Sequence, residues 1–170
     1  NLAQEPDILT RFAHTLRQSG VIGEERIAKV LYLSVTSRIL QRPVSVSVKG
    51  VSSGGKSFLV DRVLDFFPNE AYHKLTAMSE RALAYGEEPL QHRFLVLIEA
   101  DGMSGEFESY LIRSLLSEGY IRYETVEKTS EGMKPRLIER EGPTGLLVTT
   151  TRTSLHPEMK PASCPLPSAT

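Results

Sequence analysis

The residues best suited to chemistry lie between positions 50 and 57, where the sequence reads GVSSGGKS. Gly50, four intervening residues, then Gly55, Lys56 and Ser57 fit the phosphate-loop pattern G-x-x-x-x-G-K-[ST]. Glycines let the backbone turn tightly, so that successive N–H groups point at a phosphate, and the lysine adds a full positive charge. The serine hydroxyl can enter the coordination shell of Mg²⁺. The pattern predicts a site for ATP with Mg²⁺; the alternative is a glycine-rich turn with a chance lysine.

A strand and a helix must hold this loop in place. The alternating run Val44–Val48 predicts the strand before the loop, and the segment Lys56–Phe67 predicts the helix after it, ending at Pro68. The positive end of that helix adds to an anion site. We therefore expect contacts with the nucleotide from Gly50, Ser52, Ser53, Gly54, Gly55, Lys56, Ser57 and Phe58.

A phosphate loop also needs an acidic partner that holds the metal and orients a water molecule. The continuous apolar run Phe94–Ile98 is typical of a central parallel strand, and Glu99 and Asp101 follow it. We assign Glu99 to the metal and to the attacking water, and Asp101 to its support. The alternative is that both carboxylates only solvate the end of the strand. Ala100 separates them, and if it stands where the base belongs, hydrolysis is slow.

A further polar group is expected at the end of the last strand, Gly145–Thr151. Thr149, Thr150 and Thr151 offer hydroxyl groups there, and we assign to Thr150 the role of sensing the γ-phosphate. The alternative is that threonine simply suits a strand.

The remaining segments complete an α/β pattern. Helices are predicted over Pro6–Ser19, from Ile27 to about Gln41, from Ser79 to Tyr85, and from Ser104 to Gly119, where a buried stripe would contain Phe107, Tyr110, Leu111, Leu115 and Leu116. Two charged, extended segments around a turn at 129–132 predict a β-hairpin over residues 121–141, solvated and with ion pairs across its strands. The pattern favours a three-layer α-β-α fold with a parallel central sheet. Its parts would be an N-terminal helix (1–20), a core (21–156) and an unstructured, proline-rich tail (157–170).

Composition excludes few classes of function. The formal net charge is −1, so no bulk charge attracts nucleic acid or membrane, and the single cysteine excludes an intrachain disulfide. No apolar run approaches the length of a membrane span, and no signal peptide opens the sequence. We expect a cytoplasmic protein. The start at Asn1 suggests a segment of something longer.

Together these segments resemble the AAA+ ATPase core. Val21-Ile22-Gly23-Glu24, followed by Ala28-Lys29 and a long helix, is similar to the segment of the unfoldase ClpX that cups adenine, which implies that Val21, Ile22 and Gly23 contact the base. The hairpin before the last strand is similar to the pre-sensor hairpin of the ClpX, MCM and viral-helicase branches. The sequence also resembles a bacterial primase- and helicase-associated ATPase family in segments such as SVKGVSSGGKS and GPTGLLVTTT.

The resemblance implies an ATPase that works as a homo-oligomeric ring in an ATP-driven DNA-processing machine. The alternatives are a protein remodeller, or a nucleotide-binding switch with little hydrolysis. The helical lid that follows the last strand in AAA+ proteins is missing, so we expect this segment to bind ATP and to hydrolyse it poorly alone. With one extra base before the Lys160 codon, residues 160–170 can be re-read as ETRLLSLTIRD, so a frameshifted, a truncated and a native tail all stay open.

Overall fold

The fold is built around one parallel β-sheet of five strands. The computed structural model describes residues 6–51, 55–75, 82–98, 106–130, 132–151 and 162–165. The strands follow the order β2-β3-β6-β1-β7, and every neighbouring pair is parallel. Their bounds are Val46–Lys49 (β1), Tyr72–Leu75 (β2), Arg93–Leu97 (β3), Thr144–Thr150 (β6) and Ala162–Pro165 (β7). The predicted α/β class with a parallel central sheet is confirmed.

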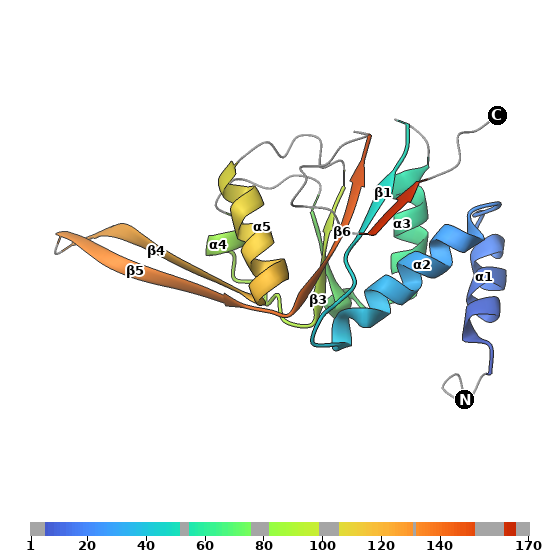
Figure 1. The fold of residues 1–170 in the computed structure, drawn as a ribbon, viewed down its shortest axis with the longest axis horizontal. Coiled ribbons are helices and arrows are strands. Elements are labelled where there is room, and N and C mark those ends of the chain that lie inside the picture. Colours follow the sequence, from blue (N-terminus) through green and yellow to red (C-terminus); the bar gives the residue numbers. More distant parts are fainter. Residues whose placement is uncertain are drawn as a thin grey trace.

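Helices cover both faces of this sheet (Figure 1). On one face, α1, α2 and α3 enclose a core that includes Phe12, Leu31 and Val60; on the other, α4 and α5 enclose a core that includes Leu111 and Leu146. The bounds of the helices are Ile8–Gln18 (α1), Glu25–Thr36 (α2), Lys56–Leu64 (α3), Ala82–Tyr85 (α4) and Glu106–Glu118 (α5), with 3-10 turns at Ser37–Ile39 (η2) and Asn69–Ala71 (η3). Among the described residues, no helix is both long enough and apolar enough to span a membrane.

The sheet packs tightly at its centre because one position there has no side chain. Phe94 on β3 is fully buried, and its ring lies against Gly145 on the neighbouring strand β6. A Cβ atom added at Gly145 would lie 2.7 Å from Phe94 Cδ2, closer than non-bonded carbon atoms approach. Glycine is therefore required at this position to make room for the aromatic ring.

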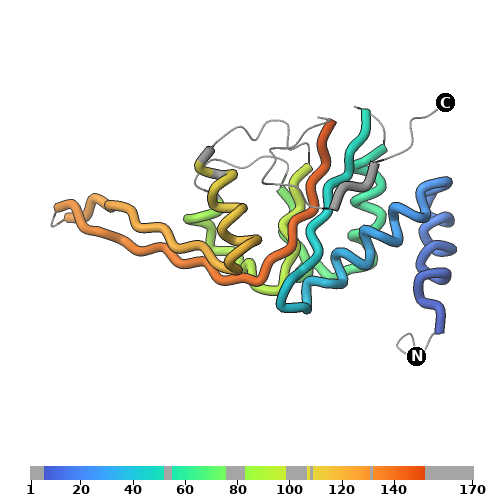
Figure 2. The backbone as a smooth tube through the Cα atoms, in the orientation of Figure 1, coloured from blue at the N-terminus to red at the C-terminus, as the bar shows by residue number. Residues whose placement is uncertain are grey.

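The predicted hairpin is confirmed as a long two-stranded ribbon that projects from the body (Figures 1 and 2). Its strands are β4 (Tyr120–Thr129) and β5 (Gly132–Glu141), paired in antiparallel register along their whole length. Predicted ion pairs across the ribbon are present, with Arg122 Nε 2.5 Å from Glu139 Oε1 and Arg136 Nη1 3.0 Å from Glu127 Oε2.

The base of the hairpin is anchored to the body by an arginine. The Arg140 guanidinium donates to the backbone carbonyls of Leu83, Gly86 and Glu88, which belong to α4 and the turn after it. Partial burial lowers the pKa of Arg140 from its ordinary value. Arg140 thus joins the hairpin to a segment that lies more than fifty residues earlier in the sequence.

Two expectations about secondary structure differ from what the structure shows. The tail after residue 157 was expected to be unstructured, whereas Ala162–Pro165 forms strand β7 and pairs with β1. The second helix was expected to reach Gln41 with Ile39 on its buried face. Instead α2 ends at Thr36, and the 3-10 turn η2 rotates Ile39 into solvent.

The buried stripe expected on α5 is correct at Leu111 and Leu115 and wrong at Tyr110, which is exposed. Ile112 is buried in its place. Successive residues of a helix point about 100° apart, so the face that contains 111 and 115 takes in 112 and turns 110 outward. The buried face of α5 therefore includes Ile112 in place of Tyr110.

Candidate nucleotide-binding site

The strand, loop and helix of the phosphate-loop motif occupy their expected places. β1 ends at Lys49, and α3 begins at Lys56. Gly55, directly before the helix, has φ +71° and ψ 5°, a left-handed conformation that side-chain-bearing residues rarely adopt. Ser52, Ser53 and Gly54, which were also predicted to contact the nucleotide, lie outside the described residues.

Lys56 points back into this loop and is only 6% exposed. Its Nζ donates to the carbonyl oxygens of Gly50 at 3.0 Å and Val51 at 2.6 Å. A buried ammonium group needs such partners, because taking an unpaired charge out of water costs more than burying a neutral polar group. An ammonium carries three N–H donors, and the two carbonyls account for two of them. Counting the described residues alone, the lysine is thus held at the loop with one N–H donor left for an anion.

The end of β6 lies directly beside the loop. Lys49 is in register with Thr150, and Gly50 N donates to Thr150 O at 3.3 Å. Thr149 and Thr150 are both buried. The structure therefore brings Thr150, the residue assigned to γ-phosphate sensing, next to the first glycine of the loop. The sequence order alone separates these two residues by a hundred positions.

The strand that leads to the predicted acidic residues is also near. β3 is the next strand beyond β6, and it ends at Leu97, which is in register with Val148. Glu99 and Asp101 themselves lie outside the described residues. Their roles in metal binding and in orienting water therefore stay predictions, carried by the strand that precedes them.

The loop that contains the predicted adenine contacts lies against the first turn of α3. A Cβ atom at Gly20 would lie 3.9 Å from Phe58 Cζ. Val21 is buried in the same core cluster as Leu59, whereas the neighbouring Ile22 is 81% exposed. Gly23 has φ +87°, so the loop turns sharply there. Of the three predicted contacts, the side chain of Ile22 is the one that faces outward.

One residue of this surface was not found by sequence reasoning. The Arg62 guanidinium carbon lies 5.5 Å from the centroid of the Phe58 ring, a distance typical of a cation–π contact. The signal was present, because Phe58 and Arg62 are four residues apart on one helix and so share a face.

The side chain of Glu24, which follows this loop, lies where a negatively charged carboxylate is unfavourable. Its Oε2 atom is buried and has no hydrogen-bond partner among the described residues. Burial, and secondarily the neighbouring Glu25, raise the pKa of Glu24 above its ordinary value of 4.5. Glu25 is the opposite case, because a hydrogen bond from Arg17 at 2.5 Å lowers its pKa.

Replacing Glu24 by glutamine is expected to raise the melting temperature at pH 7. A pKa raised in the folded state means that the folded protein holds this proton more tightly than the unfolded chain does. The carboxylate therefore lowers stability once the pH rises through the folded pKa, and the gain from glutamine should vanish below pH 4.5. Thermal melting at pH values from about 4 to about 8 measures this dependence, because this range includes the ordinary pKa of glutamate and neutral pH.

Glu25→Gln is the matched control. Because the pKa of Glu25 is lowered, its carboxylate stabilises the fold above the unfolded pKa, and its loss should lower the melting temperature at pH 7. Equal shifts of the same sign in the two variants would contradict this interpretation.

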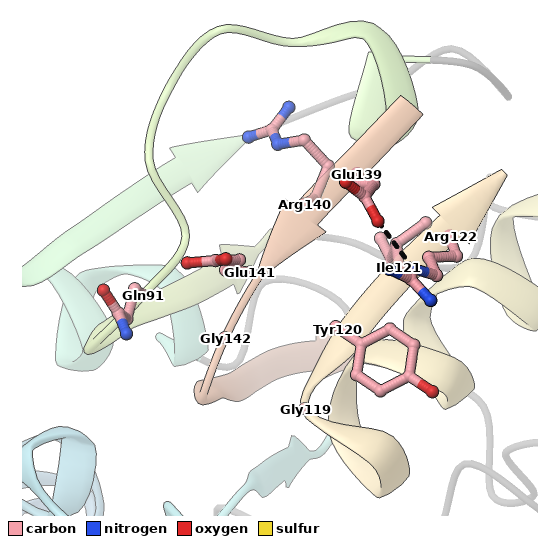
Figure 3. A pocket seen from close by; sticks show the side chains of 9 residues that line it. All are labelled: Gln91, Gly119, Tyr120, Ile121, Arg122, Glu139, Arg140, Glu141 and Gly142. Carbon is pink, nitrogen blue, oxygen red and sulfur yellow. Dashed lines mark hydrogen bonds and ion pairs between the residues drawn. The ribbon is translucent and has the colours of Figure 1, made fainter. Parts of the chain in front are cut away.

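A pocket of about 610 Å³ lies at the base of the hairpin, away from the phosphate loop (Figure 3). Gln91, Tyr120, Arg122 and Glu141 line it, and the Arg122–Glu139 ion pair closes one side. β3 and β6 begin near this point, whereas the phosphate loop lies where β1 ends. The pocket therefore lies at the amino-terminal ends of the strands, whereas the phosphate loop lies at their carboxyl ends. It takes no part in the nucleotide site.

The described residues suit a phosphate group. A left-handed glycine, a buried lysine and the first turn of a nine-residue helix converge at the loop. N–H groups in a first helical turn lack partners within the helix and favour anions. Ser57, second in the helix, is the one described loop residue predicted to reach a nucleotide-bound Mg²⁺. No cluster of three or more His, Cys, Asp or Glu able to hold a metal occurs in the described part of the chain.

Comparison with known proteins finds a family of P-loop domains. A family model described as the MTBMA_p00010 P-loop domain matches residues 2–134. This range contains the phosphate loop, β3, α5 and the first strand of the hairpin. No curated protein matches the chain.

Proposed function

Because the chain belongs to the MTBMA_p00010 P-loop domain family, we propose that it binds ATP with Mg²⁺ at the loop between β1 and α3. The observation that carries the proposal is Lys56, buried at the start of a helix and hydrogen-bonded to two loop carbonyls. In this proposal Lys56 and the backbone of 50–55 bind the phosphates, and Ser57 binds Mg²⁺. Ile22, Gly23 and Phe58 receive the base.

Titration calorimetry with ATP, in the presence and absence of Mg²⁺, tests the proposal. We expect one site per chain, with an affinity that falls when EDTA removes the metal. Adenosine, which lacks phosphates, should bind at least about tenfold more weakly, because the loop contacts contribute most of the binding free energy. Equal affinities for ATP and adenosine would contradict the proposal.

We further propose that the domain is an ATPase in which Glu99 orients the attacking water. The support is positional, since Glu99 follows β3, a buried strand that ends at the same edge of the sheet as β1. Asp101 supports Glu99, and Thr150 senses the γ-phosphate from the end of β6. The bond that breaks joins the γ-phosphorus to its bridging oxygen, and water supplies the new oxygen.

Replacing Glu99 by glutamine is expected to abolish turnover and to leave ATP binding unchanged. The amide cannot accept the proton of the attacking water, but it alters none of the loop contacts. Phosphate release and calorimetric binding measure the two effects separately. Glu87→Gln, on an exposed turn, is the matched control and should alter neither. Unchanged turnover in Glu99→Gln would remove Glu99 from this role.

The wider proposal places this domain in an AAA+ type, ring-forming machine that moves DNA. Its support is the hairpin between α5 and β6, in the position of the pre-sensor hairpin that the sequence resembles. The hairpin arginines are already engaged, since Arg122 and Arg136 pair with glutamates and Arg140 binds carbonyls. DNA contact thus rests on the resemblance. ATPase assays of the full-length protein with and without DNA test it: stimulation supports a DNA machine, whereas its absence favours a protein remodeller or a switch.

A further inference from the structure

The hairpin has two different faces. Side chains of a strand alternate between faces, so paired residues of β4 and β5 share one. On the inner face, Ile121, Tyr123 and Ile138 pack against the body, where the rings of Tyr123 and Phe107 lie 5.0 Å apart. Farther out, this face carries the paired charges Glu127 and Arg136. The inner face is therefore buried near the body, and farther out its charges Glu127 and Arg136 pair with each other.

The outer face carries apolar side chains farther out along the ribbon, beyond the Arg122–Glu139 ion pair near its base. We call its distal part the outer stripe; it consists of Glu124, Val126 and Lys128 on β4, and of Met133, Pro135 and Leu137 on β5, which are paired across the strands. Val126, Met133 and Leu137 are 58%, 67% and 56% exposed. No element covers them among the described residues (Figures 1 and 2). A contiguous apolar strip on a projecting element is typical of a contact surface.

Two charges distinguish this stripe from the rest of the ribbon. Glu124 and Lys128 form no ion pair with any described residue, unlike Arg122, Glu127, Arg136 and Glu139. They also lie symmetrically, because each is two positions from Val126 on the same face. The stripe thus presents a negative end, an apolar centre and a positive end.

We propose that the outer stripe joins two copies of this chain, face to face and antiparallel. A two-fold axis through Val126 places Glu124 of each copy opposite Lys128 of the other. The same axis brings Val126 against Val126 and Leu137 against Met133. A two-fold contact must be self-complementary, and the order of charge along this stripe has that property. The parallel arrangement would instead leave each charge opposite an apolar residue of the other copy's β5.

The ribbon favours contact through its face over contact through its edge. Pro135 has no N–H group, so the outer edge of β5 lacks a donor at the middle of the stripe. Charged side chains along both strands further discourage an added strand. Antiparallel stacking also keeps the two bodies at opposite ends, because each hairpin stands clear of its own body (Figure 1).

The contact is small, and the association is accordingly weak. The residues from Glu124 to Lys128 span four steps of a strand, or about 13 Å. A contact of this length buries less area than stable, specific interfaces do, so we expect a reversible dimer rather than a permanent one. The proposal needs no nucleotide, so its outcome is independent of ATP binding.

Sedimentation velocity on the nucleotide-free chain, from about 10 µM to about 1 mM, tests the proposal. We expect the wild type to shift from monomer to dimer across this range. Glu124→Lys and Lys128→Glu should each weaken association at least about tenfold, because each places two pairs of like charges in contact. Wild type that stays monomeric throughout would overturn the proposal.

Mixing the two variants gives the decisive readout. Chains with Glu124→Lys carry two lysines on the stripe and chains with Lys128→Glu carry two glutamates, so the pair should associate at least as well as wild type. The double variant Glu124→Lys/Lys128→Glu, which reverses the order of charge, should also recover. Glu87→Lys, away from the hairpin, is the matched control and should leave association unchanged. Failure of the mixture to associate, or an equal loss in the control, would overturn the two-fold register.

Discussion

Replacing Lys56 by alanine is expected to reduce ATP affinity at least about a hundredfold, which corresponds to about 2.7 kcal/mol. The change removes a buried positive charge at the phosphate loop. Charge-assisted hydrogen bonds to phosphate are about twice as strong as neutral ones, so their loss dominates the binding free energy. Titration calorimetry of wild type and variant measures the difference.

The fold should tolerate this change. The Lys56 ammonium contacts the carbonyl oxygens of Gly50 and Val51. Because Val51 is exposed, water can take the place of the ammonium group there. We expect the melting temperature to fall by no more than a few degrees, the shift that about 1 kcal/mol produces in a domain of this size. Lys128→Ala, on the hairpin, is the matched control and should bind ATP as wild type does. Retention of full affinity by Lys56→Ala would contradict the site.

Replacing Gly145 by alanine is expected to destabilise the protein by about 3 kcal/mol or more. The added methyl group would overlap the ring of Phe94, which is fully buried and cannot move away without displacing its neighbours. β6 then either shifts away from β3 or leaves the ring in a strained position. Chemical denaturation at 25 °C measures the loss, and insoluble expression would be its extreme form.

A smaller partner side chain separates this clash from other effects of the substitution. Phe94→Leu alone removes volume and should cost on the order of 1–2 kcal/mol. If the ring causes the clash, the double variant Phe94→Leu/Gly145→Ala should lose less free energy of unfolding than the sum of the losses in the two single variants. Additive losses would show that the methyl group acts on something other than Phe94.

The strands and helices around the loop were predictable because their signals are local. Val44–Val48 alternates and the next residues fit a phosphate loop, so β1, the loop and the start of α3 follow from neighbouring residues alone. The predicted end of the helix at Phe67 is wrong, because α3 ends at Leu64, before Pro68. The hairpin follows from its turn and from charges placed to pair across strands. The contact between Gly20 and Phe58 was not predictable, since it depends on how α1 and α2 pack against α3.

Strand β7 shows where local reasoning fails. Ala162–Pro165 is short, contains a proline and has no alternation, so nothing in its own residues indicates a strand. Its pairing comes from β1, whose outer edge offers unpaired backbone groups. Such assignments depend on neighbours that are distant in the sequence.

Strand β6 connects the phosphate loop to the base of the hairpin. This strand is buried along all seven residues; Thr144, where it leaves the hairpin, donates to Leu90 O at 2.8 Å, and Thr150, at its other end, accepts from Gly50. A stiff element thus connects the phosphate loop to the foot of a ribbon about 33 Å long. At that length, a rotation of about 5° at the foot carries the tip through about 3 Å. A small rotation at the base of the hairpin, too small to disturb the core, therefore moves the tip of the hairpin by the width of an atom or more.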